Sequence, residues 1–246
     1  MRAFLFGRLG WNRLGGNLII SGAFGLFPRK AVLASGGYAH DSIGEDMELV
    51  MRLRSRAAEE GGPHRIVFVP DPVAWTEVPE DLATLGSQRD RWHRGLIDTL
   101  WRYRRVAFRP RYGAMGMLAY PYFLLEMVAP VVEAPGLVGL SIALALDIVN
   151  TPFAILFFLA AYALATALTF ITFVFDELAF HRYHTLRDRL RLCAWALVEN
   201  LGYSQFTVVW RLRGIVNYFR GRHDWGSMQR RGFHTSRTAN AVKEAV

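Results

Sequence analysis

Apolar and polar positions divide this chain into a mixed first part and a strongly apolar second part. After Gly113, residues 115–132, 137–149 and 152–175 are almost free of charged side chains. The last stretch has 24 residues, which is enough to cross a bilayer as a helix that rises about 1.5 Å per residue. The pattern predicts a polar domain in residues 1–112 and a membrane region in residues 113–246.

Short apolar runs in the polar part have the composition of β-strands. One covers residues 18–21, a second is the run RIVFV that begins at Arg65, and a third is predicted for residues 73–77. The turn SGAFGLF, residues 21–27, contains glycines that either let the backbone approach a ligand or close a tight turn of the core. Together with the helices described next, these strands predict an α/β domain.

The stretch GEDMELVMRL, residues 44–53, predicts a helix with acids in its first turn. Ser42 and Glu45 have the spacing of a capping box, which would start the helix just after Ser42 and give Glu45 a structural role. Asp46 follows, where the helix dipole favours its ionised form. Such an acid is either ordinary helix design or a reactive group.

A second helix is predicted to begin near Asp81, to break at Gly86 and to be capped again by Ser87. Four of its later residues stand at i, i+3, i+4 and i+7 on one face: Gln88, Arg91, Trp92 and Gly95. An amide, a guanidinium, an indole and a glycine are typical of neither an apolar stripe nor a solvated face. We interpret this face as a binding face; the alternative is a buried Trp92 whose neighbours reach to solvent.

Arginine clusters flank the apolar stretches on both sides. They are Arg102, Arg104, Arg105, Arg109 and Arg111 before, and Arg182, Arg187, Arg189 and Arg191 after. Because basic residues favour the cytoplasmic side, the number of crossings between the clusters should be even. Two spans are predicted, near residues 137–149 and 152–175.

The other apolar segments are predicted not to cross. The segment with Glu126 is interrupted by Pro130 and Pro135, and either lies in the interface or leads, kinked, into the first span. Residues 192–212 predict an interfacial helix before a basic cytoplasmic tail. The expected location is the inner cell membrane, multi-pass, with the polar part and the C-terminus in the cytoplasm.

The charge of the chain is carried by arginine. Of its 29 basic residues only Lys30 and Lys243 are lysine, and the net charge is +8. Guanidinium groups suit phosphate, but no nucleic-acid-binding motif is visible, so membrane surface charge is the preferred explanation and nucleic acid is not an expected partner. The single Cys193 excludes an internal disulfide. His181 and His184 lack a third ligand, so no metal is assigned to this chain.

Six motifs in this order resemble the membrane-bound family 2 glycosyltransferases, which include the synthases of cellulose, hyaluronan and poly-N-acetylglucosamine. The motifs are SGAFGLF, GEDMELVMRL, WTEVPEDL, QRDRWHRG, and ENLGY before WGSMQRRGF. The resemblance covers essentially the whole chain. The resemblance implies that residues 1–112 are the C-terminal half of a glycosyltransferase A-type α/β domain, followed by membrane and interfacial helices.

The resemblance also implies roles for individual residues. Asp46 would be the base that takes the proton of the acceptor hydroxyl, and Gln88 and Arg91 would contact the diphosphate of a nucleotide-sugar donor, a UDP-sugar. Trp92 would stack on the acceptor, which is a saccharide or a lipid-linked sugar. The acceptor side would also be lined by the start of the glycine turn: Ser21, Gly22, Ala23 and Phe24.

The chain departs from the family in having no D-x-D motif. Family members hold Mg²⁺ or Mn²⁺ and the nucleotide through that motif, so the metal is expected only in a complete enzyme whose ligands this chain lacks. We expect the C-terminal part of such an enzyme, with a separate N-terminal half as a partner. The alternative is a non-catalytic membrane component or a degenerate remnant of a synthase.

Overall fold

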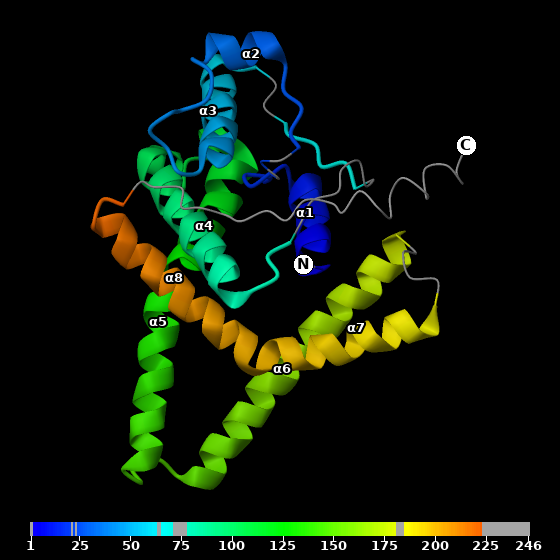
Figure 1. The fold of residues 1–246 in the computed structure, drawn as a ribbon. Helices are drawn as coiled ribbons and strands as arrows, with labels where there is room; N and C mark the ends of the chain where they lie inside the picture. Colours follow the sequence, from blue (N-terminus) through cyan, green and yellow to red (C-terminus); the bar gives the residue numbers. More distant parts are fainter. Residues whose placement is uncertain are drawn as a thin grey trace, which may run out of the picture.

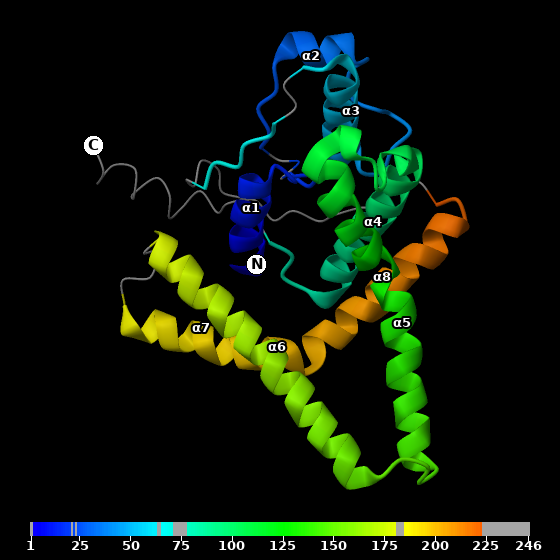
Figure 2. The same ribbon diagram turned by 180° about the vertical axis from the view of Figure 1, so that it is seen from behind.

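The computed structural model describes residues 2–20, 22, 24–62, 65–70, 78–180 and 185–222. Helices α1 to α4 form the polar part, and α5 and α6 extend away from it and meet at a turn (Figures 1 and 2). Helices α7 and α8 follow each other along one side, with α8 running beside α4.

The expected α/β fold is wrong for the described residues, because none of them forms a β-strand. Residues 18–20 have no regular secondary structure, and the carbonyls of Gly15 and Asn17 just before them accept hydrogen bonds from the Arg54 guanidinium, at 2.5 and 2.6 Å. A strand needs a second strand to complete its backbone hydrogen bonds. In this segment an arginine side chain satisfies carbonyl groups instead.

Residues 65–70 also have no regular secondary structure and are held in a similar way. The Phe68 N–H donates to Asn12 Oδ1 at 3.0 Å, and the Ile66 carbonyl accepts from Asn17 Nδ2 at 3.4 Å. Asparagine side chains therefore replace a neighbouring strand. The third expected strand, residues 73–77, lies outside the described residues.

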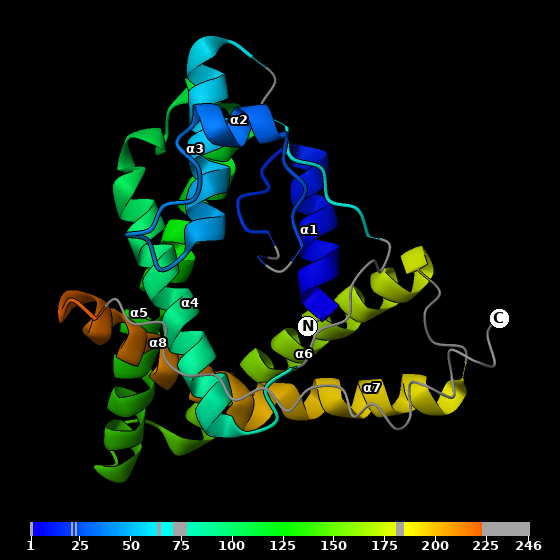
Figure 3. The same ribbon diagram turned by 45° about the horizontal axis from the view of Figure 1, so that its top comes forward.

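The polar part is built on four helices: α1 (Arg2–Leu14), α2 (Arg29–Ala34), α3 (Glu45–Glu60) and α4 (Leu82–Arg102). When the top of the molecule is turned forward, α2 crosses in front of α3, and α1 stands apart from both helices (Figure 3). The start of α4 is where the sequence predicts it. Asp81 is the N-cap, and its Oδ1 accepts from the Thr84 N–H at 2.7 Å.

Helix α4 does not break at Gly86, which corrects the sequence prediction. The reason is packing against α8 (Ser204–Phe219), because a Cβ at Gly86 would lie 2.7 Å from the indole nitrogen of Trp210. A second close contact, now from α8 to α4, is made by Gly214, where a Cβ would lie 2.9 Å from the Asp90 carbonyl oxygen. Both glycines let the two helices approach closely, and α4 stays continuous.

Short helical turns connect α4 to the apolar part: η1 (Arg104–Val106), η2 (Pro110–Tyr112) and η3 (Met115–Ala119), a π-helical turn. The largest core cluster forms where these turns meet α3, α4 and α5 (Tyr120–Ala145). Its members are Leu18, Met51, Leu96, Leu100, Val106, Tyr112, Met115, Ala119, Tyr120 and Phe123. This cluster fixes α5 to the polar part.

Two helices are long and apolar enough to cross a membrane, Met115–Ala145 and Thr151–Leu178. Only 6% of the apolar window in each is buried, so neither has the burial of a core helix in a soluble domain. The first runs without a break from η3 through Pro130 and Pro135, which makes the Glu126 segment continuous with the expected span at residues 137–149. The second belongs to α6 (Thr151–Phe180).

The predicted interfacial helix at residues 192–212 is instead two helices. Helix α7 (Leu186–Val198) and α8 are separated by the π-helical turn η4 (Glu199–Tyr203). Inside η4 the backbone leaves helical geometry at Leu201 and Gly202, where Gly202 has φ 91°. A positive φ is readily adopted only by glycine, so this residue allows the chain to change direction.

Candidate active site

Helices α3 and α4 bring the predicted acids and the predicted binding face together. Gly44, just before α3, meets Gly95 of α4 so closely that a Cβ on Gly44 would lie 3.1 Å from the Gly95 Cα. Gly95 is the last residue of the face that carries Gln88, Arg91 and Trp92, and Gly44 directly precedes Glu45. The acids at the start of α3 are therefore anchored to the α4 helix.

The predicted capping box is wrong. Helix α3 begins at Glu45, its N-cap is Gly44, and no side chain caps it. Ser42 instead donates from Oγ to Asp98 Oδ2 of α4 at 2.8 Å. This hydrogen bond is buried, so the tertiary partner has replaced the local one, and Glu45 has no capping role.

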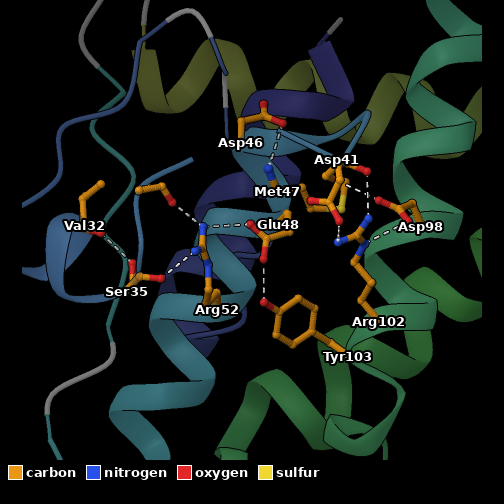
Figure 4. A network of polar contacts seen from close by, with 12 residues as sticks. Val32, Ser35, Asp41, Asp46, Met47, Glu48, Arg52, Asp98, Arg102 and Tyr103 are labelled. Carbon is orange, nitrogen blue, oxygen red and sulfur yellow. Dashed lines mark hydrogen bonds and ion pairs between the residues drawn. The ribbon is translucent and has the colours of Figure 1, made fainter. Parts of the chain in front are cut away.

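Two arginines hold the loop that precedes α3 (Figure 4). Arg102 donates from Nε to Asp98 at 3.0 Å and from both terminal nitrogens to Asp41, at 3.0 Å to its carboxylate and 2.8 Å to its carbonyl. Because Asp98 also accepts from Ser42, the loop is fixed to α4 at two successive residues. This places the first turn of α3 beside α4.

The other end of the same loop is held from α3 (Figure 4). Arg52 donates to the carbonyls of Ser35 and Gly37 at 2.6 and 2.5 Å, and to Glu48 Oε2 at 3.0 Å. Tyr103 donates to the second oxygen of Glu48 at 2.7 Å. The third acid of the helix start, Glu48, is thus committed to structure and is only 4% exposed.

Asp46 faces a cavity. Its Oδ1 accepts from the Met47 N–H at 2.8 Å, and a Cβ at Gly22 would lie 2.6 Å from its Oδ2. The cavity has a volume of about 250 Å³, and its lining includes Asp46, Gly22 and Phe24. Of the four residues predicted to line the acceptor side, Gly22 and Phe24 are therefore at this cavity, and Ser21 and Ala23 lie outside the described residues.

Two arginines interact electrostatically with Glu45 and Asp46. Burial raises the pKa of Glu45, and the charge of Asp46 raises it further, while the Arg91 guanidinium acts in the opposite direction. On the other side, burial lowers the pKa of Arg8 to about 10, and the attraction of Asp46 opposes that change. Arg8 of α1 and Arg91 of α4 thus place positive charge near the same pair of acids.

The α4 face is partly open. Gln88 and Arg91 are half-buried, and Trp92 has 51% of its surface exposed, so the alternative of a buried tryptophan does not hold. The Arg89 guanidinium lies over the Trp92 ring at 4.6 Å from its centroid, an attractive cation–π geometry. Arg89 also donates to the Tyr203 hydroxyl at 3.4 Å.

Three residues of the candidate site were not predicted from the sequence: Arg89, Arg8 and Tyr203. Arg89 stands three residues before Trp92, a spacing that brings side chains together on a helix and could have pointed to the stacking. Arg8 and Tyr203 carry no such signal, because Arg8 is on α1 and Tyr203 is 114 residues beyond Arg89.

The described residues do not fit a metal site. Among them, no three or more His, Cys, Asp or Glu side chains are grouped to hold an ion. Glu45 and Asp46 supply two carboxyl groups, and one oxygen of Asp46 is already used by the Met47 N–H, whereas hard divalent cations take about six oxygen ligands. His181 and His184 lie outside the described residues.

Comparisons with known proteins identify the family of the chain. The sequence model of the family described as "Glycosyl transferase family group 2" matches residues 3–180. The poly-beta-1,6-N-acetyl-D-glucosamine synthases of Staphylococcus aureus strains COL and MSSA476 are 32% identical to the chain over 106 residues, which is 43% of this chain and 23% of theirs. The chain thus aligns with about a quarter of the length of these relatives.

No solved structure is significantly similar to the chain. The family match extends from α1 to the end of α6 and includes both sides of the candidate site, the start of α3 and the exposed face of α4. Since it covers well over half of the residues, the chain belongs to glycosyl transferase family group 2.

Proposed function

We propose that this chain carries the acceptor side and the leaving-group side of an inverting glycosyltransferase. The enzyme would move a sugar from a UDP-sugar to a growing saccharide or glycolipid at the cytoplasmic face of the membrane. The observation that carries the proposal is the contact between Gly44 and Gly95, because it ties the carboxylates of α3 to the arginine and tryptophan of α4.

Asp46 acts as the base in this proposal. Its Oδ2, at the cavity, takes the proton of the acceptor hydroxyl while the hydroxyl oxygen attacks the anomeric carbon of the donor. The bond from that carbon to the diphosphate oxygen breaks on the opposite face, so the configuration inverts. Support comes from the hydrogen bond that fixes Oδ1 on the Met47 N–H and leaves Oδ2 toward Gly22.

Gln88 and Arg91 stabilise the nucleoside diphosphate as it leaves. Negative charge grows on the bridging oxygen during bond cleavage, and a guanidinium fork can donate two hydrogen bonds to a diphosphate. Both side chains are half-buried, which limits water around them. When bound elsewhere in a complete enzyme, Mg²⁺ or Mn²⁺ would add charge neutralisation to the same leaving group.

Trp92 binds the acceptor sugar through one face of its indole. The other face is covered by Arg89, so the sugar must approach from the side away from that guanidinium. N-acetylglucosamine is the first sugar to test, because the similar Staphylococcus aureus proteins are named as synthases of its β-1,6-linked polymer.

The two apolar helices Met115–Ala145 and Thr151–Leu178 are proposed to span the inner membrane. Arginines precede the first and follow the second, and this distribution favours a cytoplasmic position for both flanks. The acids of α3 and the face of α4 would then lie on the side where nucleotide-sugars are available.

The test uses a fusion of the N-terminal, D-x-D-containing half of a family member to the full 246-residue chain. We expect metal-dependent transfer from UDP-N-acetylglucosamine in the fusion and none from the chain alone. Asp46→Asn should reduce turnover at least about 10²-fold, in line with the loss of a general base, with the protein still folded. Glu45→Gln should reduce it less, and Asp147→Asn, an exposed acid in the turn between α5 and α6, should leave it unchanged.

Near-normal turnover of Asp46→Asn would show that another group takes the proton. A fusion that binds the donor but never transfers it would favour the alternative of a non-catalytic membrane component.

A further inference from the structure

We propose that a groove at the junction of α7 and α8 holds the alkyl or isoprenoid chain of a lipid-linked acceptor. The inference rests on the proposed function, because it assigns the acceptor of the same site to the class of amphiphiles.

The groove has a volume of about 460 Å³ and an apolar lining. Its hydrophobic residues come from α4, α7, η4 and α8: Leu82, Trp195, Val198, Leu201 and Phe206. Each of them is more than half exposed. Contiguous exposed apolar surface of this kind commonly marks an interaction site.

The helix break at η4 lies within the lining of the groove. Leu201 has φ −104° and ψ 103°, and Gly202 has φ 91°, so the chain leaves the helix between α7 and α8. The Gly202 N–H donates to the Gln205 side chain at 2.8 Å, which stabilises the turn. Leu201 and Gly202, where the backbone leaves helical geometry, both line the groove.

The groove is connected to the acceptor tryptophan. Tyr203 lines the groove, its hydroxyl accepts from Arg89 at 3.4 Å, and Arg89 covers one face of Trp92. Arg89 thus links the lining of the groove to the stacking residue, and the polar end of a chain in the groove is proposed to lie toward the exposed indole.

The groove also lies beside the second candidate membrane helix. Tyr162 of α6 donates to the Leu197 carbonyl at 3.0 Å, and Asn200 of η4 donates to Thr169 at 3.4 Å. A lipid tail could thus enter from the hydrocarbon region that α6 would occupy.

The lining chemistry favours a hydrocarbon over a saccharide. A sugar chain carries several hydroxyl groups per residue, and buried hydroxyl groups need hydrogen-bond partners. Of the eight residues that line the groove, only Glu199, Tyr203 and the indole N–H of Trp195 offer polar side-chain groups, and the Tyr203 oxygen already accepts from Arg89. An alkyl chain needs no such partners.

The binding test uses the full chain in lipid nanodiscs and a dodecyl N-acetyl-β-glucosaminide with a diazirine in its alkyl chain. Photolabelling should map to residues 195–206 and be largely lost in Val198→Trp, which fills the groove, but not in Leu186→Trp, an exposed position at the start of α7. A phospholipid with the same diazirine should label α5 and α6. Equal labelling of the groove by the phospholipid, or no labelling there by the glycoside, would overturn the proposal.

The kinetic test uses the active fusion and compares dodecyl and methyl N-acetyl-β-glucosaminides as acceptors. Val198→Trp should lower the ratio of kcat/KM for dodecyl over methyl about tenfold, the effect of about 1.4 kcal/mol of lost binding, and Leu186→Trp should preserve it. An unchanged ratio in Val198→Trp, with both acceptors impaired alike, would assign the groove to a saccharide. Asp46→Asn should abolish transfer to both acceptors, so failure of the base assignment is seen separately.

Discussion

Gly44 and Gly95 meet backbone to backbone, and this contact sets the distance between the two halves of the candidate site. A Cβ on Gly95 would lie 3.1 Å from the Gly44 Cα and 3.2 Å from its nitrogen. These are backbone atoms, so a side chain at either position can be accommodated only if α3 and α4 separate. The acids and the arginine of the site lie on opposite sides of this contact.

Gly95→Ala should therefore impair both catalysis and stability. Overpacking costs about 1–3 kcal/mol of the free energy of unfolding, and because α3 and α4 must move apart by a few tenths of an ångström, the acids and the arginine lose their relative position and the rate should fall by up to about 10²-fold. Turnover of the fusion and its thermal unfolding should be measured together. Gly10→Ala on α1, where a Cβ meets nothing within 4 Å, is the matched control and should preserve both; a fully active Gly95→Ala would contradict the importance of this contact.

Arg91→Lys should raise the KM for the UDP-sugar and lower kcat, because an ammonium group cannot reproduce two parallel hydrogen bonds to a diphosphate. We expect a combined loss of about 10- to 100-fold in kcat/KM, the effect of about 1.4–2.7 kcal/mol. Arg105→Lys, at an exposed arginine, is the control. If both variants behaved alike, Arg91 would act through general charge and not through a specific contact with the leaving group.

Local signals predicted the parts of the fold that depend on local contacts. The start of α4 was predicted from the sequence near Asp81, and the structure confirms it, because the cap is a hydrogen bond between residues three apart. The apolar helix that contains residues 152–175 was likewise predicted, since hydrophobic composition over about 20 residues is a strong signal. The first apolar helix was predicted only in part, because it runs from Met115 to Ala145 and not only near residues 137–149.

Predictions failed where a distant residue supplied the contact. Ser42 has the spacing for a capping box with Glu45, but Asp98, 56 residues later, takes its hydroxyl. Gly86 has the propensity of a helix breaker, but the indole of Trp210 requires a glycine there. The predicted strands do not form for the same reason. The side chains of Arg54 and Asn17 donate hydrogen bonds to backbone carbonyl groups of these segments, and a single sequence does not reveal such partners.

Of the candidate site, the two motifs could be predicted and their surroundings could not. The motifs are local patterns on α3 and α4. The cavity beside Asp46 depends on Gly22, and the stacked face of Trp92 depends on Arg89 and Tyr203, which meet only through the packing of α8 on α4.

The full chain should remain with the membrane after extraction with high salt and with alkaline carbonate, because two helices of 31 and 28 residues would span the bilayer. A reporter fused after Val246 should stay cytoplasmic, as the arginine distribution predicts. Release by carbonate would contradict spanning helices, and a periplasmic reporter would show an odd number of crossings.

Next to the tryptophan of the site, His93 is buried among three helices and is only 4% exposed. The Arg211 Nε donates to its Nδ1 at 3.5 Å. Arg211 also donates to the Glu126 carbonyl and lies 4.0 Å from its carboxylate. Burial lowers the pKa of His93 to about 4, and the charge of Arg211 contributes to the decrease.

Acid should destabilise the protein through His93. In the unfolded chain this histidine binds a proton below about pH 6.5, but in the folded protein only below about pH 4. The free energy of unfolding should therefore fall as the pH decreases between these two values, by at most about 3 kcal/mol from this residue. Thermal unfolding in detergent at several pH values should give a shallower dependence for His93→Gln. His40→Gln, an exposed histidine, should retain the wild-type slope, and an equal slope in His93→Gln would mean that His93 titrates normally in the folded state.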